Sequence, residues 1–229
     1  MEMPTLDWIR AEFHYGYDSG DVLARLPGFV RLREERAIGG SYRKVFLNAV
    51  APYLRPESRV LELGPGKGSW SRAILKYLPS GELHTVDFQD ARKWLHPEKY
   101  GARLVCHQVN DNTFDCLQEA YFDFFWSFGV LCHNEIGSIR TILVNARKKV
   151  KPGAWSVHHY GDWRKLDRFG WKRGRVPVEF QLKPDNEIWW PRNDPDSMAR
   201  TALEAGWEIV TPDMDLLLRD SMILLRNPG

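Results

Sequence analysis

The segment 60–70, VLELGPGKGSW, constrains the fold more than any other part of the chain. A short apolar run ends in a glycine-rich turn, and apolar residues at helical spacing follow directly. Glycines let a backbone turn sharply and approach a ligand closely because they lack a Cβ. The N–H groups at the start of the next helix then face that ligand. The segment therefore predicts a strand, a ligand-binding turn and a helix of an open α/β sheet.

The remainder of the chain continues this alternation of strands and helices. Apolar runs predict strands at 59–63, 82–87, 104–109, 122–128, about 155–160, 207–210 and 221–225. Helical spacing is expected at 42–54, 69–78 and 136–150, and Asp194-Pro195 begins another helix that stops at Gly206. About ten residues join the last two strands, which is too short for a parallel crossover, so the final strand should be antiparallel. We expect a doubly wound, seven-stranded, mostly parallel Rossmann-like sheet.

The expected organisation is one α/β domain preceded by a helical region. Residues 1–54 predict short helices broken by glycines. Residues 55–229 are expected to form the ligand-binding domain. Within it, residues 163–192 interrupt the alternation after the fifth strand as an insertion.

Two ligands compete for the glycine-rich turn, a dinucleotide and S-adenosylmethionine. The dinucleotide fingerprint needs glycine at its sixth position, where this chain has Ser69. Glu62 precedes the turn by two residues; its charge would repel a pyrophosphate but attract a sulfonium and an ammonium group. Asp87 ends the second strand and could accept both ribose hydroxyls of either ligand. The acidic residue before the turn favours S-adenosylmethionine.

As an ensemble, these motifs resemble the class I S-adenosylmethionine-dependent methyltransferases. The resemblance covers roughly residues 58–160 and 195–229 and includes ELGPGKG, the strand DFFWSFGVLCHN and the turn KPG. It implies that S-adenosyl-L-methionine is the cofactor and S-adenosyl-L-homocysteine the product. It further implies that residues 1–54 form a helical lid over the sheet and that the insertion 163–192 forms a substrate wall. It also implies a set of cofactor-binding residues: Tyr42, Glu62, Gly64, Gly66, Gly68, Asp87, Phe88, Asn110, Asp111, Ser127 and Phe128. Within that set, Asp111 would accept the adenine amino group, although it could instead cap a turn.

A base near the end of the fourth strand would suit methylation of a hydroxyl, because that nucleophile must lose a proton. The small-molecule members that this chain resembles often carry their catalytic group there, which makes His133 the first candidate. The Asn/Asp-Pro-Pro-aromatic signature of amino-methyltransferases is absent at this place, which argues against exocyclic nitrogens of bases as acceptors.

A second pair of candidates, His158 and His159, ends the fifth strand. Successive side chains on a strand point to opposite faces, so one of the two should face the cleft as a base or substrate contact. Tyr160 and Asp162 follow as candidate substrate contacts. The spacing of these His and Asp residues matches no strong metal signature, so Mg²⁺ is not indicated.

The stretch 163–192 is rich in aromatic and basic residues, including Trp163, Trp189 and Trp190 as candidate substrate contacts. Aromatic faces with polar groups between them suit the C–H faces of sugars, and they also suit nucleic acid. They equally suit the packing of a surface connection or a homo-oligomer interface. The preferred acceptor is a sugar, glycoside or oligosaccharide, as in bacterial sugar O-methyltransferases.

Composition sets the remaining expectations. A net charge of +2 lacks the basic excess of a dedicated nucleic-acid binder, which disfavours an RNA methyltransferase. Three cysteines with no CxxC pair, no long apolar run and no secretory leader predict a cytoplasmic protein without a membrane partner. The alternatives are an RNA or natural-product methyltransferase, a non-catalytic partner protein with this fold, and a dehydrogenase.

Overall fold

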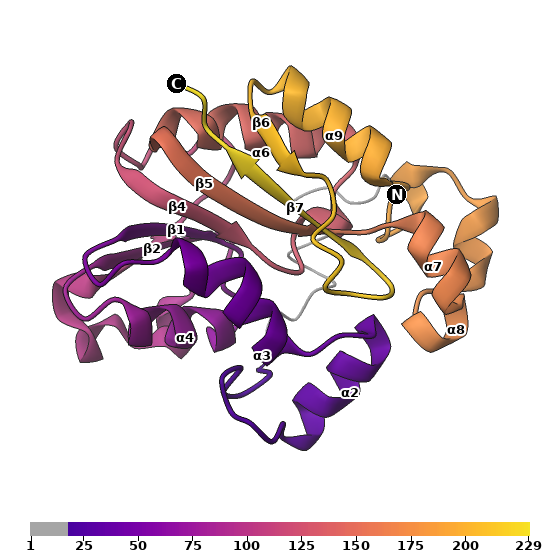
Figure 1. The fold of residues 1–229 in the computed structure, drawn as a ribbon, viewed down its shortest axis with the longest axis horizontal. Coiled ribbons are helices and arrows are strands. Elements are labelled where there is room, and N and C mark those ends of the chain that lie inside the picture. Colours follow the sequence, from indigo (N-terminus) through magenta and orange to yellow (C-terminus); the bar gives the residue numbers. More distant parts are fainter. Residues whose placement is uncertain (1–17) are drawn as a thin grey trace.

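The computed structural model describes residues 18–229, which form one seven-stranded sheet with helices on both faces (Figure 1). The strand order across the sheet is β3-β2-β1-β4-β5-β7-β6. The strands are β1 (Arg59–Leu63), β2 (Glu82–Asp87), β3 (Leu104–Gln108), β4 (Phe122–Ser127), β5 (Val150–Tyr160), β6 (Glu208–Thr211) and β7 (Ser221–Arg226).

The pairing confirms the predicted sheet. Strands β1 to β5 pair in parallel, whereas β7 is antiparallel to both β5 and β6. The strand order reverses at β1, which lies between β2 and β4. Ligands of open α/β sheets bind at the carboxyl ends of the strands beside such a reversal, so this edge is the expected site.

Helices cover the two faces of the sheet. The longer ones are α2 (Phe29–Ile38), α4 (Ser69–Tyr77), α6 (Ile136–Lys149), α7 (Trp163–Phe169) and α9 (Pro195–Glu204). Single turns are α3 (Tyr42–Val45), α5 (Arg92–Leu95) and α8 (Trp171–Gly174). Short π or 3-10 segments are η1 (Phe46–Val50), η2 (Ala51–Tyr53), η3 (Pro97–Lys99), η4 (Gly101–Arg103), η5 (Leu131–His133), η6 (Val178–Leu182) and η7 (Asp185–Glu187).

Each face of the sheet has its own hydrophobic core. On β1, Val60 packs with α4 and the N-terminal helices, whereas Leu61 and Leu63 pack with α6 and α9. Figure 1 shows α6 and α9 on one side of the sheet and α3 and α4 on the other. Alternate side chains of a strand point to opposite faces, so one apolar strand supplies both cores.

Local sequence explains the boundaries of α9. The Asp194 side chain accepts a hydrogen bond from the Ser197 N–H, and the Ser197 hydroxyl accepts one from the Asp194 N–H. Pro195 occupies the first turn, where its missing N–H has no cost. Gly206 follows the helix with φ of 84°, a left-handed conformation that favours glycine.

Two segments differ from the sequence-based expectation. The helix expected over 42–54 is divided into α3, the π-helix η1 and the 3-10 helix η2. Pro52 lies in η2 and has no N–H for the continuing α-helical ladder, which accounts for the change of helix type there.

The KPG segment is also placed differently. Residues 151–153 belong to β5, which starts at Val150 rather than near Trp155. The pairing of β4 with β5 shifts between Phe122 and Phe124, and such a bulge accommodates a proline inside a sheet.

The stretch 163–192 comprises α7, α8, η6 and η7 around a small core of its own. That core contains Leu166, Trp171, Phe180 and Trp190. The first 17 residues of the expected lid lie outside the described residues, and the described part of the lid contains α2, α3, η1 and η2. The division at residue 54 stays a prediction.

Candidate functional site

The turn between β1 and α4 brings backbone to the reversal point of the sheet. Gly64, Gly66 and Gly68 have φ of 69°, 54° and 84°, a region that other residues rarely adopt. A Cβ on Gly64 would lie 2.3 Å from Cγ2 of Val130, and one on Gly68 would lie 2.2 Å from Cδ2 of Leu95. Only glycine allows this close approach of backbone and side chains.

A cavity of about 270 Å³ opens at this turn and extends across the carboxyl ends of β1, β2, β4 and β5. Three groups of residues line it. The sheet edge and the turn contribute Gly64, Pro65, Gly66, Asp87, Phe88, Val109, Asn112 and Phe128. The N-terminal helices contribute Ser19, Glu34, Ala37, Ile38 and Tyr42. The far end is formed by Cys132, His133, Asn134, His159, Arg175, Trp189, Trp190 and Arg219.

Asp87 and Phe88, the residues expected to hold a ribose and an adenine, both line the cavity. The buried Asp87 carboxylate accepts hydrogen bonds from the backbone N–H groups of Gln89, at 2.8 Å, and of Phe88. Desolvation raises the pKa of Asp87 to about 6, outweighing both hydrogen bonds. The two carboxylate oxygens have lone pairs for further donors, such as hydroxyl groups of a ligand.

The polar residues after β3 are not placed as the resemblance to the methyltransferase family implies. Asp111 is exposed and accepts hydrogen bonds from the N–H and hydroxyl of Thr113, at 2.9 and 2.7 Å. These bonds lower the pKa of Asp111 and hold it in a local turn. Neither Asn110 nor Asp111 lines the cavity, whereas Asn112 does. Asn112 is a candidate partner for the adenine that the spacing alone did not indicate.

Glu62 and Ser127 are buried behind the cavity rather than on its surface. The Glu62 carboxyl accepts a hydrogen bond from the Ser71 hydroxyl in the first turn of α4. Desolvation raises the pKa of Glu62 to about 8, so the group is mostly protonated at neutral pH. Ser127 contacts the His158 ring at 2.8 Å. In the unliganded protein both side chains support the turn and the strand ends from behind.

The N-terminal helices close one side of the cavity with Tyr42 and Glu34. The Tyr42 ring packs against Trp70 and Phe128, with each pair of centroids 5.3 Å apart. Glu34 accepts a hydrogen bond from the Ser19 hydroxyl through Oε2, and a hydrogen bond with the Tyr42 side chain also stabilises its carboxylate. Its buried Oε1 has no partner within hydrogen-bond distance among residues 18–229. Burial raises the pKa of Glu34. Glu34 was not among the residues predicted from the motifs, although a carboxylate at a buried position of a helix could have identified it.

His133 lies at the far end of the cavity. Its Nδ1 is 2.8 Å from the Trp189 carbonyl oxygen, which can only accept, so the proton is on Nδ1 and Nε2 carries the lone pair. The centroid of the Trp190 ring lies 5.2 Å from that of the imidazole. The imidazole surface faces the cavity, and desolvation lowers the pKa of His133 to about 4. The ring is therefore neutral at physiological pH.

The two histidines of β5 lie on opposite faces. His158 is buried, with its two ring nitrogens at hydrogen-bond distance from Ser127 and Ser156, and its pKa is lowered to about 3 by burial. His159 lines the cavity, stacks on Phe128 and accepts a hydrogen bond from the Gly129 N–H at Nδ1. Only His159 of this pair can touch a ligand.

An ion-paired network holds His159 in place. Its Nε2 donates to the Asp220 carboxylate at 2.9 Å, and Arg219 contacts the same oxygen at 2.6 Å. Both ring nitrogens of His159 thus have partners. Arg219 also donates to the Gly174 carbonyl and lies 4.6 Å from the centroid of Trp190. The geometry suits His159 to positioning rather than proton abstraction.

Three predicted substrate contacts, Tyr160, Asp162 and Trp163, do not line the cavity. The Tyr160 hydroxyl donates to the Pro212 carbonyl, and Asp162 caps α7 and accepts from the Ser221 hydroxyl. Trp163 donates through Nε1 to the Trp190 carbonyl oxygen at 3.2 Å. These side chains support the wall that Trp189 and Trp190 present to the cavity.

The described residues limit two other classes of site. Within 18–229, no group of three or more His, Cys, Asp or Glu side chains is placed to hold a metal ion. None of the helices in the same range combines the length and apolarity needed to cross a membrane.

The site offers acceptors for the hydrogen-bond donors of S-adenosylmethionine, which are its ribose hydroxyls and its ammonium group. The carboxylates of Asp87 and Glu34 can accept these donors, and the glycine-rich turn 64–68 leaves room for the ligand to approach the backbone.

The fold is similar to that of solved methyltransferase structures. A SAM-dependent methyltransferase from Aquifex aeolicus has 14% identity and a TM-score of 0.61, and the match covers 84% of this chain and 92% of that chain. The PH0226 protein from Pyrococcus horikoshii OT3 has 15% identity and a TM-score of 0.63, covering 97% and 99%.

A third structure is the 1,6-didemethyltoxoflavin-N1-methyltransferase of Burkholderia thailandensis, described with S-adenosylhomocysteine bound. It is 16% identical with a TM-score of 0.55, and 82% of each chain is covered. Among curated proteins, highly reducing polyketide synthase 40 of Fusarium mangiferae is 26% identical over 174 residues, 74% of this chain. This match spans only 7% of that protein's length.

The family model described as "Methyltransferase domain" matches residues 33–211. That range contains β1 to β6, the glycine turn, Asp87 and every predicted histidine. The chain therefore belongs to this family, as a class I S-adenosylmethionine-dependent methyltransferase.

Proposed function

We propose that the protein methylates a hydroxyl of a small polyhydroxy molecule, such as a sugar or glycoside, with His133 accepting the hydroxyl proton. The observation that carries the proposal is the state of His133: a neutral imidazole with its proton on Nδ1, at the end of the cavity away from Asp87. A hydroxyl is a poor nucleophile until its proton is removed, and a neutral imidazole nitrogen can receive that proton.

S-adenosylmethionine, when bound, supplies a methyl group made electrophilic by a sulfonium. The chain's own groups then act on the acceptor. The rings of Phe128, Trp189 and Trp190 surround the acceptor end of the cavity and keep bulk water away from it. The bond from His133 to the Trp189 carbonyl keeps Nε2 as the basic nitrogen. Holding the hydroxyl near this nitrogen and in line with the methyl group supplies most of the rate enhancement.

The size and lining of the cavity support a small acceptor. Tyr42, Phe128, Trp189 and Trp190 enclose it from the N-terminal helices, β4 and the 163–192 stretch. Aromatic faces can stack on the C–H face of a sugar ring. They also favour a second candidate, a planar aromatic acceptor, and one structural relative is a 1,6-didemethyltoxoflavin N1-methyltransferase. Other relatives include a carbon methyltransferase, so the atom methylated here is itself part of the proposal.

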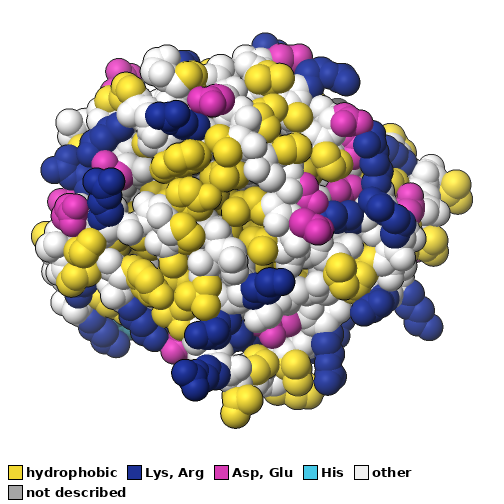
Figure 2. All heavy atoms as spheres, viewed as in Figure 1, with side chains coloured by type: hydrophobic (Ala, Val, Ile, Leu, Met, Phe, Trp, Pro, Cys, Tyr) yellow, Lys and Arg dark blue, Asp and Glu magenta, His cyan; other side chains and the backbone are white. Residues whose placement is uncertain are grey.

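The molecular surface supports the same choice over a nucleic acid. On the face shown in Figure 2, Lys and Arg side chains surround apolar patches and are interspersed with Asp and Glu. A nucleic-acid binder usually gathers its basic groups into a continuous stripe.

The test combines cofactor binding with product analysis. S-adenosylhomocysteine is titrated by calorimetry, and methyl transfer to sugars and to phenols is followed by mass spectrometry of the product. His133→Ala should lower turnover by about 10²- to 10⁴-fold while S-adenosylhomocysteine affinity stays the same. His107→Ala, which changes a histidine outside the cavity, is the control.

The pH profile gives a second readout. Because the pKa of His133 lies at about 4, wild-type turnover at saturating S-adenosylmethionine should hold down to about pH 5 and fall as the ring becomes protonated. Unchanged turnover in His133→Ala would refute the role of His133. Methylation of only nitrogen or carbon acceptors would refute the hydroxyl acceptor.

A further inference from the structure

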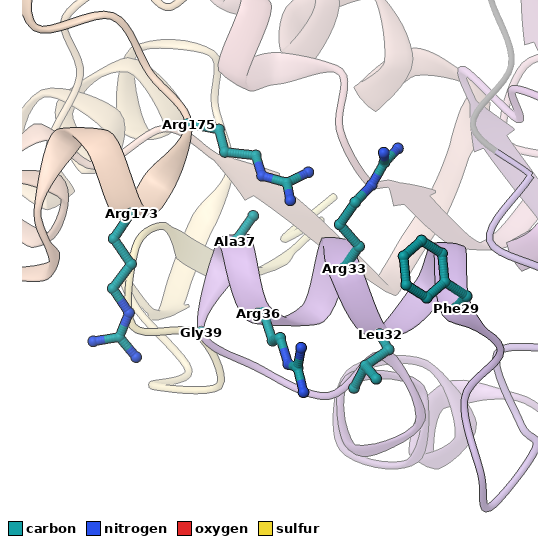
Figure 3. A pocket seen from close by; sticks show the side chains of 8 residues that line it. All are labelled: Phe29, Leu32, Arg33, Arg36, Ala37, Gly39, Arg173 and Arg175. Carbon is teal, nitrogen blue, oxygen red and sulfur yellow. The ribbon is translucent and has the colours of Figure 1, made fainter.

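A second hollow, a groove of about 430 Å³, lies against the outer side of α2 (Figure 3). Its lining combines four arginines, Arg33, Arg36, Arg173 and Arg175, with Phe29, Leu32, Ala37 and Gly39. Among residues 18–229, no carboxylate lines this groove. It adjoins the cofactor cavity, because Ala37 and Arg175 line both.

The arginines of the groove have little compensating charge within the described part of the chain; Arg33 interacts electrostatically with Glu34, which lines the neighbouring cavity rather than the groove. None of the four forms an ion pair with another residue of 18–229, although other exposed arginines do, such as Arg164 with Asp196. Arg173 instead lies over the Phe169 ring, 4.2 Å from its centroid. Guanidinium groups stay charged at any physiological pH. Four positive charges around one groove repel one another, and an anionic ligand would relieve that repulsion.

One of the arginines, Arg175, lies at the junction of the groove and the cavity, because it lines both. Figure 3 shows Arg33 and Arg175 extending on the same side of α2, whereas Arg36 extends on the other side. Arg175 follows α8 with φ of 58°, and its N–H bonds to the Lys172 carbonyl. A residue other than glycine seldom keeps this backbone conformation unless surrounding structure imposes it. The conformation directs the Arg175 side chain to the junction of the two hollows.

We propose that the acceptor carries a phosphoryl group, bound by Arg33 and Arg175 in this groove while its methyl-accepting end occupies the cavity near His133. The inference rests on the proposed function, since it specifies the acceptor of that same site. A phosphate monoester or diphosphate carries two or more negative charges and offers several oxygens to the planar donor forks of arginine. A carboxylate carries one charge and would leave most of the four arginines uncompensated.

The experiment uses the protein saturated with S-adenosylhomocysteine and inorganic pyrophosphate as the probe. Calorimetry at constant ionic strength should show millimolar or tighter binding, and Arg33→Gln or Arg175→Gln should each weaken it by about tenfold. Arg200→Gln on α9 removes an equal charge far from the groove and should leave pyrophosphate affinity unchanged. A matched set of glucose, glucuronate and glucose 6-phosphate tests the class of anion, and the phosphate ester should bind tightest.

Several results would overturn the proposal. They are no pyrophosphate binding at millimolar concentration, equal binding by wild type and Arg33→Gln, and glucuronate binding as tightly as glucose 6-phosphate. A failure of the phosphoryl proposal can be told apart from a failure of the proposed function. Arg33 lies outside the cofactor cavity, so unchanged S-adenosylhomocysteine affinity in Arg33→Gln shows that the variant is folded. The comparison of wild type with His133→Ala tests the methyl-transfer step independently of the groove.

Discussion

The two halves of the cavity are built in different ways. The cofactor half, consisting of the turn 64–68 with Asp87 and Phe88, comes from two adjacent strands and is shaped mainly by backbone. The acceptor half, consisting of His133, His159, Trp189, Trp190 and Arg219, comes from four segments far apart in the sequence. The first depends on backbone conformations that favour glycine and on close contacts that leave no room for a Cβ, and the second depends on a network of side chains.

This difference has a consequence for each half. Backbone geometry recurs wherever the same short motif folds, so a cofactor can be recognised by many chains with little in common outside it. A network of buried charges and rings is stable only when it is complete, because the removal of one member leaves the buried polar group of another without its partner. The acceptor half should therefore be the part in which single polar substitutions cost the most stability.

The largest effect is expected at Asp220. Burial alone would raise its pKa, but the charge of Arg219 and the hydrogen bond from His159 outweigh burial and lower it. Asp220→Asn leaves Arg219 buried without its counter-charge and should lower the free energy of unfolding by about 3–5 kcal/mol, measured by urea denaturation. Asp196→Asn, at an exposed ion pair with Arg164, should cost under about 1 kcal/mol. Similar losses in both variants would show that the buried network behind the acceptor half is no more sensitive to the loss of one charge than an exposed ion pair is.

The next largest effect is expected for Gly64→Ala, which changes the turn in the cofactor half of the cavity. The added Cβ meets Val130 at 2.3 Å, so overpacking of about 1–3 kcal/mol adds to the left-handed strain. Gly101→Ala is the matched control, because Gly101 also has positive φ, 57°, but open space around it. We expect Gly64→Ala to abolish measurable S-adenosylhomocysteine binding and Gly101→Ala to retain it. Equal affinities for the two variants would show that the close approach at the turn is not required.

The smallest effect is a pH dependence at Asp87. Its pKa is raised to about 6, so the folded protein binds a proton more tightly than the unfolded chain. Stability from this group is present at low pH and is lost as pH rises from about 4 to about 6.

Ligand binding should show the opposite trend. Ribose hydroxyls require the ionised carboxylate, so S-adenosylhomocysteine affinity should fall by up to about tenfold per pH unit below about 6. Calorimetry across this range, with Asp87→Asn as the pH-independent reference, measures the effect. An affinity of wild type that does not change between pH 5 and 7 would remove Asp87 from the ribose site.

Motif and periodicity predicted the sheet almost completely. All seven strands lie where apolar runs placed them, and the short link before β7 correctly indicated its antiparallel direction. Each of these features depends on neighbours in the sequence: a run of apolar side chains, a glycine that permits positive φ, or a cap such as Asp194. The π and 3-10 segments after Val45 and the early start of β5 were missed, because tertiary packing chooses among helix types and strand registers.

The sequence by itself determined the fold class, the glycine-rich turn and the place of Asp87 at the end of β2, since the physics of these features acts over a few adjacent residues. Only the tertiary structure decided which polar residues face the cavity. It turned His159 toward the cavity and His158 into the sheet, and it used Asp162 to cap α7. It also placed Glu34 beside Tyr42, and Arg219 beside Trp190. These side-chain orientations depend on contacts between segments that come together only when the chain has folded, so the spacing of residues in the sequence cannot predict them.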